Sequence, residues 1–306
     1  MSFSSVLKDL EEDFEREGRL TVFMLGATDV GKTFTTVRIA NAFLQRSERV
    51  AVVDADIGQS DIGPPCCVGV GVLHCEIRSL REVPPHSLFF VGSTSPNGCM
   101  RESILGTVAG VRKARELADV VIVDSTGWVF GNKAKMFKLL EIGAVEPSSV
   151  LAIEREEGEL QHILSLLPEY TDARICILRA SAEAKRKCKP LRRRLREEAF
   201  NRYFRNARNR RFDISLFERS GCLPIVEEGS LLGLFTASQE EEALGIGILR
   251  KIDEKRGSAV VLTPVEPRAV KRIKVGKVKL WRSKGRLREV FSVPFAPALP
   301  PRDYLR

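Results

Sequence analysis

Residues 19–33 decide the fold, and they read RLTVFMLGATDVGKT. An apolar run over residues 20–25 leads into the octet 26–33, which fits the pattern G-x-x-x-x-G-K-[ST]. In a P-loop of this kind, backbone N–H groups and the positive end of the following helix surround phosphate oxygens. A turn that matches by chance is the alternative, but an apolar strand pattern precedes the octet and an amphipathic helix pattern follows it. The sequence therefore predicts a nucleoside triphosphate site.

The residues of the octet have separate expected roles. Lys32 is placed to reach the β- and γ-phosphates, and the hydroxyl of Thr33 is placed to ligate Mg²⁺. The other residues expected to bind the nucleotide come from the same loop and from the start of the helix: Gly26, Thr28, Asp29, Val30, Gly31 and Phe34.

The strand patterns predict a parallel sheet. A second apolar strand at residues 49–56 follows the P-loop helix, and a strand, a helix and a strand form a βαβ unit. Further core strands are expected at residues 87–92, 119–124, 149–153 and 174–178, and further helices at about 100–117 and 159–167. The predicted fold class is α/β: a P-loop NTPase with a mostly parallel central sheet flanked by helices, plus a small C-terminal β domain.

We expect the chain to have three parts. Residues 1–19 form a lead-in helix, and residues 20–220 form the P-loop domain, which includes a lid segment at about 185–211. From residue 221 onward, short β-type runs separated by Gly and Pro predict a small β-rich domain that extends to residue 306. Its tail after Pro294 is rich in proline and is expected to be irregular.

Acidic residues end two of the predicted strands. Asp54 and Asp56 follow the second strand, and Asp124 ends the strand at 119–124. Because the carboxyl ends of parallel strands form the ligand crevice of an open sheet, these carboxylates are expected beside the triphosphate. A carboxylate there can hold Mg²⁺ or accept a proton from an attacking hydroxyl. The alternative for Asp54 and Asp56 is a pair of strand-end caps.

A tryptophan lies in the loop that follows Asp124. Trp128 stands between Gly127 and Gly131, at the edge of the sheet where the ligand is expected. One interpretation is that the indole packs against the next helix. The other is that it provides a stacking platform for a nucleobase.

Positive charge is concentrated in one segment. The net charge of the chain is +9, and residues 185–211 contain thirteen Lys and Arg against two Glu. This segment therefore carries a surplus of eleven positive charges, and the rest of the chain sums to −2. A solvated helix face usually mixes charges of both signs, so this concentration favours a polyanion partner.

Several other classes are not favoured. No stretch approaches the roughly 18 to 20 apolar residues that span a bilayer, and charged residues interrupt the N-terminus where a signal peptide would lie. The seven cysteines have irregular spacing, and the three histidines have no spaced partner. We therefore expect a soluble, intracellular (cytoplasmic) protein with no membrane partner, disulfide framework or histidine metal site.

Together these motifs resemble the polynucleotide 5′-hydroxyl kinases, the P-loop kinases associated with RNA 3′-end formation, ribosomal RNA processing and tRNA splicing. The resemblance covers roughly residues 20 to 285. Eukaryotic members carry an additional N-terminal β domain, whereas here about twenty residues precede the first core strand. The motifs that carry the resemblance are TDVGKT at 28–33, DIGQ at 56–59, TSP at 94–96, TGWV at 126–129, the arginine-bearing lid helix that ends in YF at 203–204, and the LGIGI and TPV segments at 244–248 and 263–265.

The resemblance implies transfer of the γ-phosphate of ATP, with Mg²⁺, to the 5′-hydroxyl of RNA, and it leaves DNA and RNA-processing protein partners open. It implies that Asp56 orients and deprotonates the hydroxyl and that Trp128 stacks on a terminal base. The implied catalytic residues are Lys32, Asp56, Arg192 and Arg196, with Lys187 as an alternative in the lid. The implied substrate-binding residues are Gln59, Thr94, Ser95, Thr126, Gly127 and Trp128. The implied metal-binding residues are Thr33, Asp56 and Asp124.

Two other functions compete with this one. Dethiobiotin synthetase-like enzymes also use a TDVGKT loop, and partitioning-type ATPases share the acids at the strand ends, but neither class explains Trp128 or the basic lid segment. A scaffold that binds ATP and recruits RNA-processing partners without transferring phosphate is the second alternative. The presence of Lys32, Thr33, Asp56 and Trp128 argues for retained catalysis.

Overall fold

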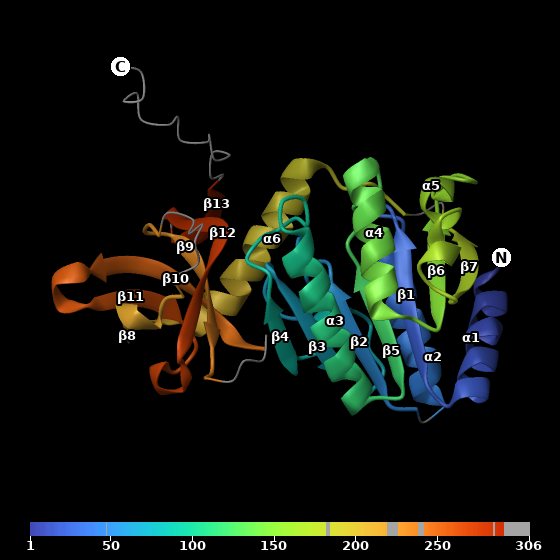
Figure 1. The fold of residues 1–306 in the computed structure, drawn as a ribbon, viewed down its shortest axis with the longest axis horizontal. Coiled ribbons are helices and arrows are strands. Elements are labelled where there is room, and N and C mark those ends of the chain that lie inside the picture. The colour runs from blue at the N-terminus through green and yellow to red at the C-terminus, as the bar shows by residue number, and fades with distance from the viewer. Residues whose placement is uncertain (47, 182–183, 219–225, 238–241, 284, 291–306) are drawn as a thin grey trace, which may run out of the picture.

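Two β-sheets, joined by a long helix, make up the protein (Figure 1). The structure is a computed structural model, and it describes residues 1–306 apart from 47, 182–183, 219–225, 238–241, 284 and 291–306. The predicted irregular tail after Pro294 lies outside the described residues. None of the described helices combines the length and the apolar character that crossing a bilayer requires.

The first sheet holds the P-loop. Its strand order is β4-β3-β2-β5-β1-β6-β7, and β2, β5, β1, β6 and β7 are parallel neighbours. Only β3 runs against its neighbours β2 and β4. The strands of this sheet are β1 (Leu20–Gly26), β2 (Val50–Ala55), β3 (Cys67–Val72), β4 (Ser87–Phe90), β5 (Val120–Ser125), β6 (Ser149–Glu154) and β7 (Arg174–Arg179).

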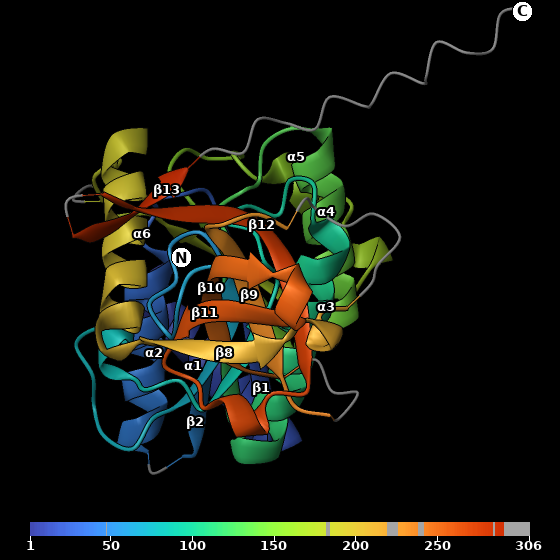
Figure 2. The ribbon, with the colours of Figure 1, turned by 90° about the vertical axis from the view of Figure 1, so that its left-hand side faces the viewer.

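Helices cover both faces of this sheet, so its central strands are buried along their whole length (Figure 2). Helices α1 and α2 pack on one face, and α3 and α4 pack on the other. This two-sided burial explains why the strands read as unbroken apolar runs. The helices are α1 (Phe3–Glu17), α2 (Lys32–Gln45), α3 (Met100–Leu117), α4 (Asn132–Val145), α5 (Gln161–Leu164) and α6 (Lys189–Tyr203).

The second sheet is antiparallel throughout, with the order β13-β12-β9-β10-β11-β8. It has an apolar core of its own, which includes Phe212, Leu234 and Val261. Its strands are β8 (Arg208–Asp213), β9 (Ser230–Phe235), β10 (Ala243–Asp253), β11 (Ser258–Thr263), β12 (Arg272–Ser283) and β13 (Arg286–Val290).

The two sheets are in direct contact. One buried apolar cluster combines Cys67 of β3, Phe200 of α6 and Ile248 of β10. Beside it, the backbone N–H of Lys277 donates to the carbonyl oxygen of Gly92 at 2.7 Å. Helix α6 therefore lies between the sheets and packs against both.

The predicted fold class is confirmed. Strand β3 is the main element that the sequence patterns missed, because its alternating glycines in CVGVGV hide its strand character. The expected helix in the segment 159–167 is shorter than predicted, since only Gln161–Leu164 is α-helical. The domain boundaries stay a prediction, although β8 pairs with β11 in the second sheet and thus lies on the other side of the expected boundary at residue 220.

Candidate active site

The P-loop has the backbone shape that surrounds a phosphate. Strand β1 ends at Gly26, where an added Cβ would come within 2.8 Å of the carbonyl oxygen of Ile153. Gly31, which precedes α2, adopts a left-handed conformation with φ of +100°, and Asp29 does so with φ of +63°. Left-handed residues of this kind turn successive N–H groups toward one concave face.

Lys32 lies across this loop. It is buried, and its ammonium group donates to the carbonyl oxygens of Gly26 at 3.0 Å and Ala27 at 2.9 Å. Burial lowers the pKa of Lys32, and the nearby carboxylates of Asp124 and Asp56 oppose that shift. Among the described residues, these two carbonyl oxygens are the hydrogen-bond acceptors of the ammonium group, which is well placed to exchange them for phosphate oxygens.

Thr33 and Asp124 form a second polar contact at the same edge. The Thr33 hydroxyl donates to Oδ2 of Asp124 at 2.6 Å, while Oδ1 is buried and has no hydrogen-bond partner among the described residues. Burial raises the pKa of Asp124 to about 6, although Lys32 and the Thr33 hydroxyl lower it in part. Because an unpartnered buried carboxylate oxygen is costly, this atom marks a place where a cation fits.

The structure separates the roles of the two acids after β2. Asp54 is buried, and its Oδ2 accepts from the backbone N–H groups of Asp61 at 2.6 Å and Ile62 at 2.9 Å, so it holds the following loop in shape. Burial raises its pKa well above the usual value. Asp56 is partly exposed, and its Oδ1 accepts from the N–H groups of Gly58 and Gln59. Neither of these bonds uses Oδ2 of Asp56.

Two cavities meet at Asp56. We call them the P-loop cavity, with a volume of about 260 Å³, and the lid cavity, of about 500 Å³. Lys32 and Thr33 line the first, whereas Thr94 and Thr126 line the second. The residues that line both are Thr28, Asp56, Gln59 and Arg192. These four side chains are therefore a common border of the two cavities.

The predicted lid arginines have different surroundings. Arg192 lines both cavities, and its Nη1 lies 4.0 Å from Oδ2 of Asp29. Arg196 lines only the lid cavity, and a carboxylate of β13 binds it. Lys187, the alternative candidate, lines the P-loop cavity and donates its backbone N–H to Asp29 at 2.8 Å.

The loop after β5 packs against the P-loop. At Gly127 an added Cβ would come within 2.5 Å of the backbone nitrogen of Thr28, so only glycine fits there. Trp128 is half-buried, and its ring lies 5.7 Å from that of Phe137 in α4, so the helix-packing interpretation is present in the structure. Trp128 and the exposed Ser95 are not among the residues described as lining either cavity.

Phe34 and Val30 face a further cavity of about 500 Å³ beside the P-loop, between α2 and the end of β7. Phe34 is 66% exposed and also lines the P-loop cavity. The two cavities thus share an aromatic wall directly after the phosphate-binding loop.

Sequence reasoning missed two residues that shape this site. Arg155 follows β6, and it donates to the carbonyl oxygens of Asp29 at 2.9 Å and Ala184 at 3.0 Å, which ties the P-loop to the start of the lid segment. The position of Arg155, a charged residue directly after a buried strand, was the feature of the sequence that could have indicated this role. The second is Glu289, whose partner lies 93 residues away, and no local pattern indicates such a pairing.

The comparison with known families decides the relationship. The model of the family described as mRNA cleavage and polyadenylation factor CLP1 P-loop matches residues 26–206, which begin at the P-loop and extend through the lid helix. The chain belongs to this family.

Curated relatives agree with that assignment. A polyribonucleotide 5′-hydroxyl-kinase of Pyrococcus horikoshii is 33% identical over 195 residues, which cover 64% of this chain and 52% of the relative. One of Pyrococcus furiosus is 35% identical over 219 residues, covering 69% and 60%. The chain therefore matches between half and three fifths of the length of these relatives.

A solved structure of the family has the same fold. The wild-type Clp1p–Pcf11p (454–563) complex contains a chain that is 12% identical, with a TM-score of 0.65, over 90% of this chain and 78% of that one. At this identity the likeness bears on the fold alone. It extends beyond the P-loop region into the second sheet, since the family model ends at residue 206.

Proposed function

We propose that this protein is an ATP-dependent polynucleotide kinase that transfers the γ-phosphate of ATP to the 5′-hydroxyl of RNA. The observation that carries the proposal is the meeting of two cavities at Asp56, one of them at the P-loop and the other under a basic helix. A nucleotide hydrolase needs only the first cavity. The second, with arginines along its wall, suits a phosphate-bearing strand as acceptor.

In the proposed reaction, different residues bind the nucleotide, accept the proton and stabilise the transferring group. Lys32 and the P-loop N–H groups bind the β- and γ-phosphates, and the exposed ring of Phe34 borders the nucleoside. The 5′-hydroxyl oxygen forms a bond to the γ-phosphorus, the bond from that phosphorus to the β–γ bridging oxygen breaks, and the hydroxyl proton passes to Asp56. Arg192, which lines both cavities, lies where the charge of the transferring phosphoryl group develops.

The residues present fit a magnesium ion. Mg²⁺ prefers oxygen ligands and is commonly held by one or two carboxylates together with substrate phosphates. Thr33 and Asp124 supply such oxygens, including Oδ1 of Asp124, which has no hydrogen-bond partner among the described residues. Asp56 lines the P-loop cavity together with Thr33. When bound, the ion neutralises negative charge on the phosphate oxygens.

The lid cavity accommodates the 5′ end of an RNA strand. Gln59, Thr94 and Thr126 contribute polar groups to the lid cavity, and Gly127 allows its loop to approach the P-loop closely. We infer that the partly exposed Trp128 of this loop stacks on the terminal base. These contacts read backbone and base faces, so RNA-processing proteins, as in the Clp1p–Pcf11p complex, are the proposed source of target choice.

The deciding experiment uses ATP labelled on its γ-phosphate, Mg²⁺ and a short 5′-hydroxyl RNA. The wild-type protein is expected to label this RNA and not a 5′-phosphorylated copy. Lys32→Ala and Asp56→Asn should each reduce the rate at least about 100-fold, since a general base typically contributes 10²- to 10⁴-fold.

Asp61→Asn is the matched control, because Asp61 lies in the same loop and pairs with Arg81 at 2.7 Å. It should stay within twofold of the wild type. ATP bound without label on RNA or DNA would overturn the proposal in favour of an ATP-bound scaffold, and label released as free phosphate would indicate an ATPase.

A further inference from the structure

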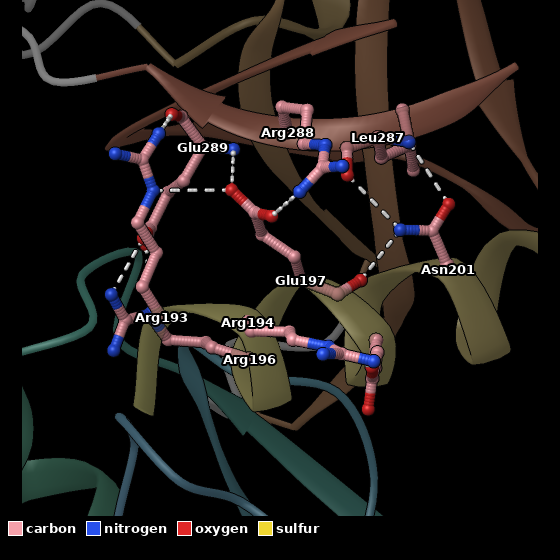
Figure 3. A network of polar contacts seen from close by, with 9 residues as sticks. Arg193, Arg194, Arg196, Glu197, Asn201, Leu287, Arg288 and Glu289 are labelled. Atoms are coloured by element: carbon pink, nitrogen blue, oxygen red, sulfur yellow. Dashed lines mark hydrogen bonds and ion pairs between the residues drawn. The ribbon is translucent and has the colours of Figure 1, made fainter. Parts of the chain in front are cut away.

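The strand β13 binds the lid helix α6 through a paired ion contact. Arg196 of α6 donates from Nε and Nη2 to the two carboxylate oxygens of Glu289, at 2.9 and 2.6 Å (Figure 3). Both side chains are largely buried, with 16% and 8% of their surfaces exposed. A bidentate contact of this kind fixes the plane of the guanidinium as well as its position.

Further bonds surround this pair. Glu197 accepts from Nε of Arg193 at 3.1 Å, from Nη1 of Arg288 at 2.7 Å and from the backbone N–H of Glu289 at 3.2 Å. Asn201 bonds both ways with the backbone of Leu287, donating at 3.0 Å and accepting at 2.9 Å. Arg193 also donates to the carbonyl oxygen of Glu289. The strand is therefore held at several positions along the helix rather than at one point.

The two arginines that Glu289 binds also line the lid cavity. Arg193 and Arg196 both belong to its wall, together with Asp56 and Thr94. The two bonds to Glu289 use Nε and Nη2 of Arg196, so Nη1 has no partner among the described residues and can donate to an incoming phosphate or sugar oxygen.

The network joins three guanidinium groups, of Arg193, Arg196 and Arg288, to two carboxylates, of Glu197 and Glu289. Two of these arginines, Arg193 and Arg196, line the lid cavity. Other ion pairs of the second sheet, such as that of Lys279 with Glu227, involve no residue described as lining either cavity.

We infer that Glu289 is a positioning residue for the acceptor substrate: it holds Arg196 at the wall of the lid cavity, so the second sheet completes the site that binds the 5′ end. The inference rests on the proposed kinase function. It gives the second sheet a part in substrate binding, through one carboxylate that acts on Arg196.

The test compares steady-state transfer to a 5′-hydroxyl RNA 10-mer by the wild type, Glu289→Gln, Arg196→Met and the double variant. Glu289→Gln should raise KM for the RNA about tenfold and leave KM for ATP within twofold. In the Arg196→Met background, the same substitution should change neither value further, because its effect passes through Arg196.

Glu227→Gln is the control, since it breaks an exposed ion pair in the same sheet and should leave both KM values unchanged. Glu289→Asp, which keeps the charge on a shorter stem, should restore part of the RNA affinity. If circular dichroism shows that Glu289→Gln does not fold, Glu289→Asp is used in its place in the comparison. Equal changes in the two KM values, or an undiminished effect in the Arg196→Met background, would overturn the inference.

Failure of the kinase proposal is a separate result. If the wild type transfers no phosphate, the same four proteins are compared for affinity toward a fluorescein-labelled 5′-hydroxyl RNA 10-mer. A tenfold loss in Glu289→Gln that disappears in the Arg196→Met background supports the positioning role, and equal affinity of all four proteins refutes it.

Discussion

Single residues on the lid helix differ sharply in their surroundings. Arg194 points outward and pairs with the exposed Glu198. Arg193 pairs with the buried Glu197 of its own helix, whereas the carboxylate that binds Arg196 comes from β13. Neighbours in the sequence therefore have separate tasks, because one helical turn directs each to another face. Glu197 is the acidic residue that this arrangement buries, and its ionisation links lid stability to pH.

The hydrogen bonds to Glu197 set the direction of that link. Burial alone would raise its pKa, but hydrogen bonds from Arg288, the Glu289 amide and Arg193 outweigh burial and lower the pKa below the ordinary 4.5. A lowered folded-state pKa means that the stabilisation is complete above about pH 4.5 and is lost as the pH falls through the folded-state value.

Glu197→Gln is expected to reduce the free energy of unfolding by about 1.5–3 kcal/mol at pH 7, the usual range for hydrogen bonds to charged groups. In urea unfolding series, the difference from the wild type should shrink below pH 4.5. Glu198→Gln, at an exposed neighbour, should cost less than about 0.5 kcal/mol at either pH. A difference in unfolding free energy between Glu197→Gln and the wild type that stays constant down to pH 3 would contradict the lowered pKa of Glu197.

Among the elements, the loop after β5 and the P-loop depend on each other. The loop approaches the P-loop closely at Gly127, where no side chain fits, and this contact links the P-loop with Thr126 in the wall of the lid cavity. Any displacement of one loop therefore moves the other.

Gly127→Ala should test this dependence. Its Cβ would lie 2.5 Å from the Thr28 nitrogen, so one of the two loops must shift. We expect ATP to bind at least tenfold more weakly by calorimetry, which corresponds to about 1.4 kcal/mol. Gly106→Ala in α3 is the matched control. The added Cβ would make only ordinary contacts, with Val68 and Val91 at 3.4 Å. Equal ATP affinity in the two variants would show that the close approach is not needed.

Sequence patterns predicted the elements well where each signal was local. The P-loop, the apolar strands and helix α3, whose predicted limits are those found, follow from short-range periodicity. The β3 strand was missed because its glycines remove the apolar pattern, and Glu289 was missed because its partner is distant in the sequence. Trp128 was left open between packing and stacking, and its half-exposed ring against Phe137 still allows both.

Across the whole molecule, positive charge gathers on the segment that crosses from one sheet to the other. Exposed basic residues of this segment include Arg186 and Lys189, and the latter lines the lid cavity. A basic segment of this kind attracts a polyanion, and it borders the two cavities at Arg192.

Binding of single-stranded RNA should therefore weaken as salt rises. For single strands, the slope of log affinity against log salt changes by about 0.7 for each phosphate that a protein neutralises. Arg186→Gln with Lys189→Gln should reduce the slope by up to about 1.4, measured by fluorescence anisotropy between low and moderate salt. Lys251→Gln with Lys255→Gln removes the same charge from exposed positions in the second sheet and should leave the slope unchanged. Equal slopes in both pairs would refute a specific role for the lid segment.

The pairing of Arg196 with Glu289 also has a consequence for synthesis of the chain. The two residues are separated by 93 positions, which a ribosome takes roughly 5 to 20 seconds to translate at 5–20 residues per second. During that interval the P-loop is already outside the ribosome, while Arg196 lacks its carboxylate. On the proposed function, a nascent chain can thus bind nucleotide before Arg196 is positioned for the acceptor, and the order of translation delays phosphate transfer until the second sheet has formed.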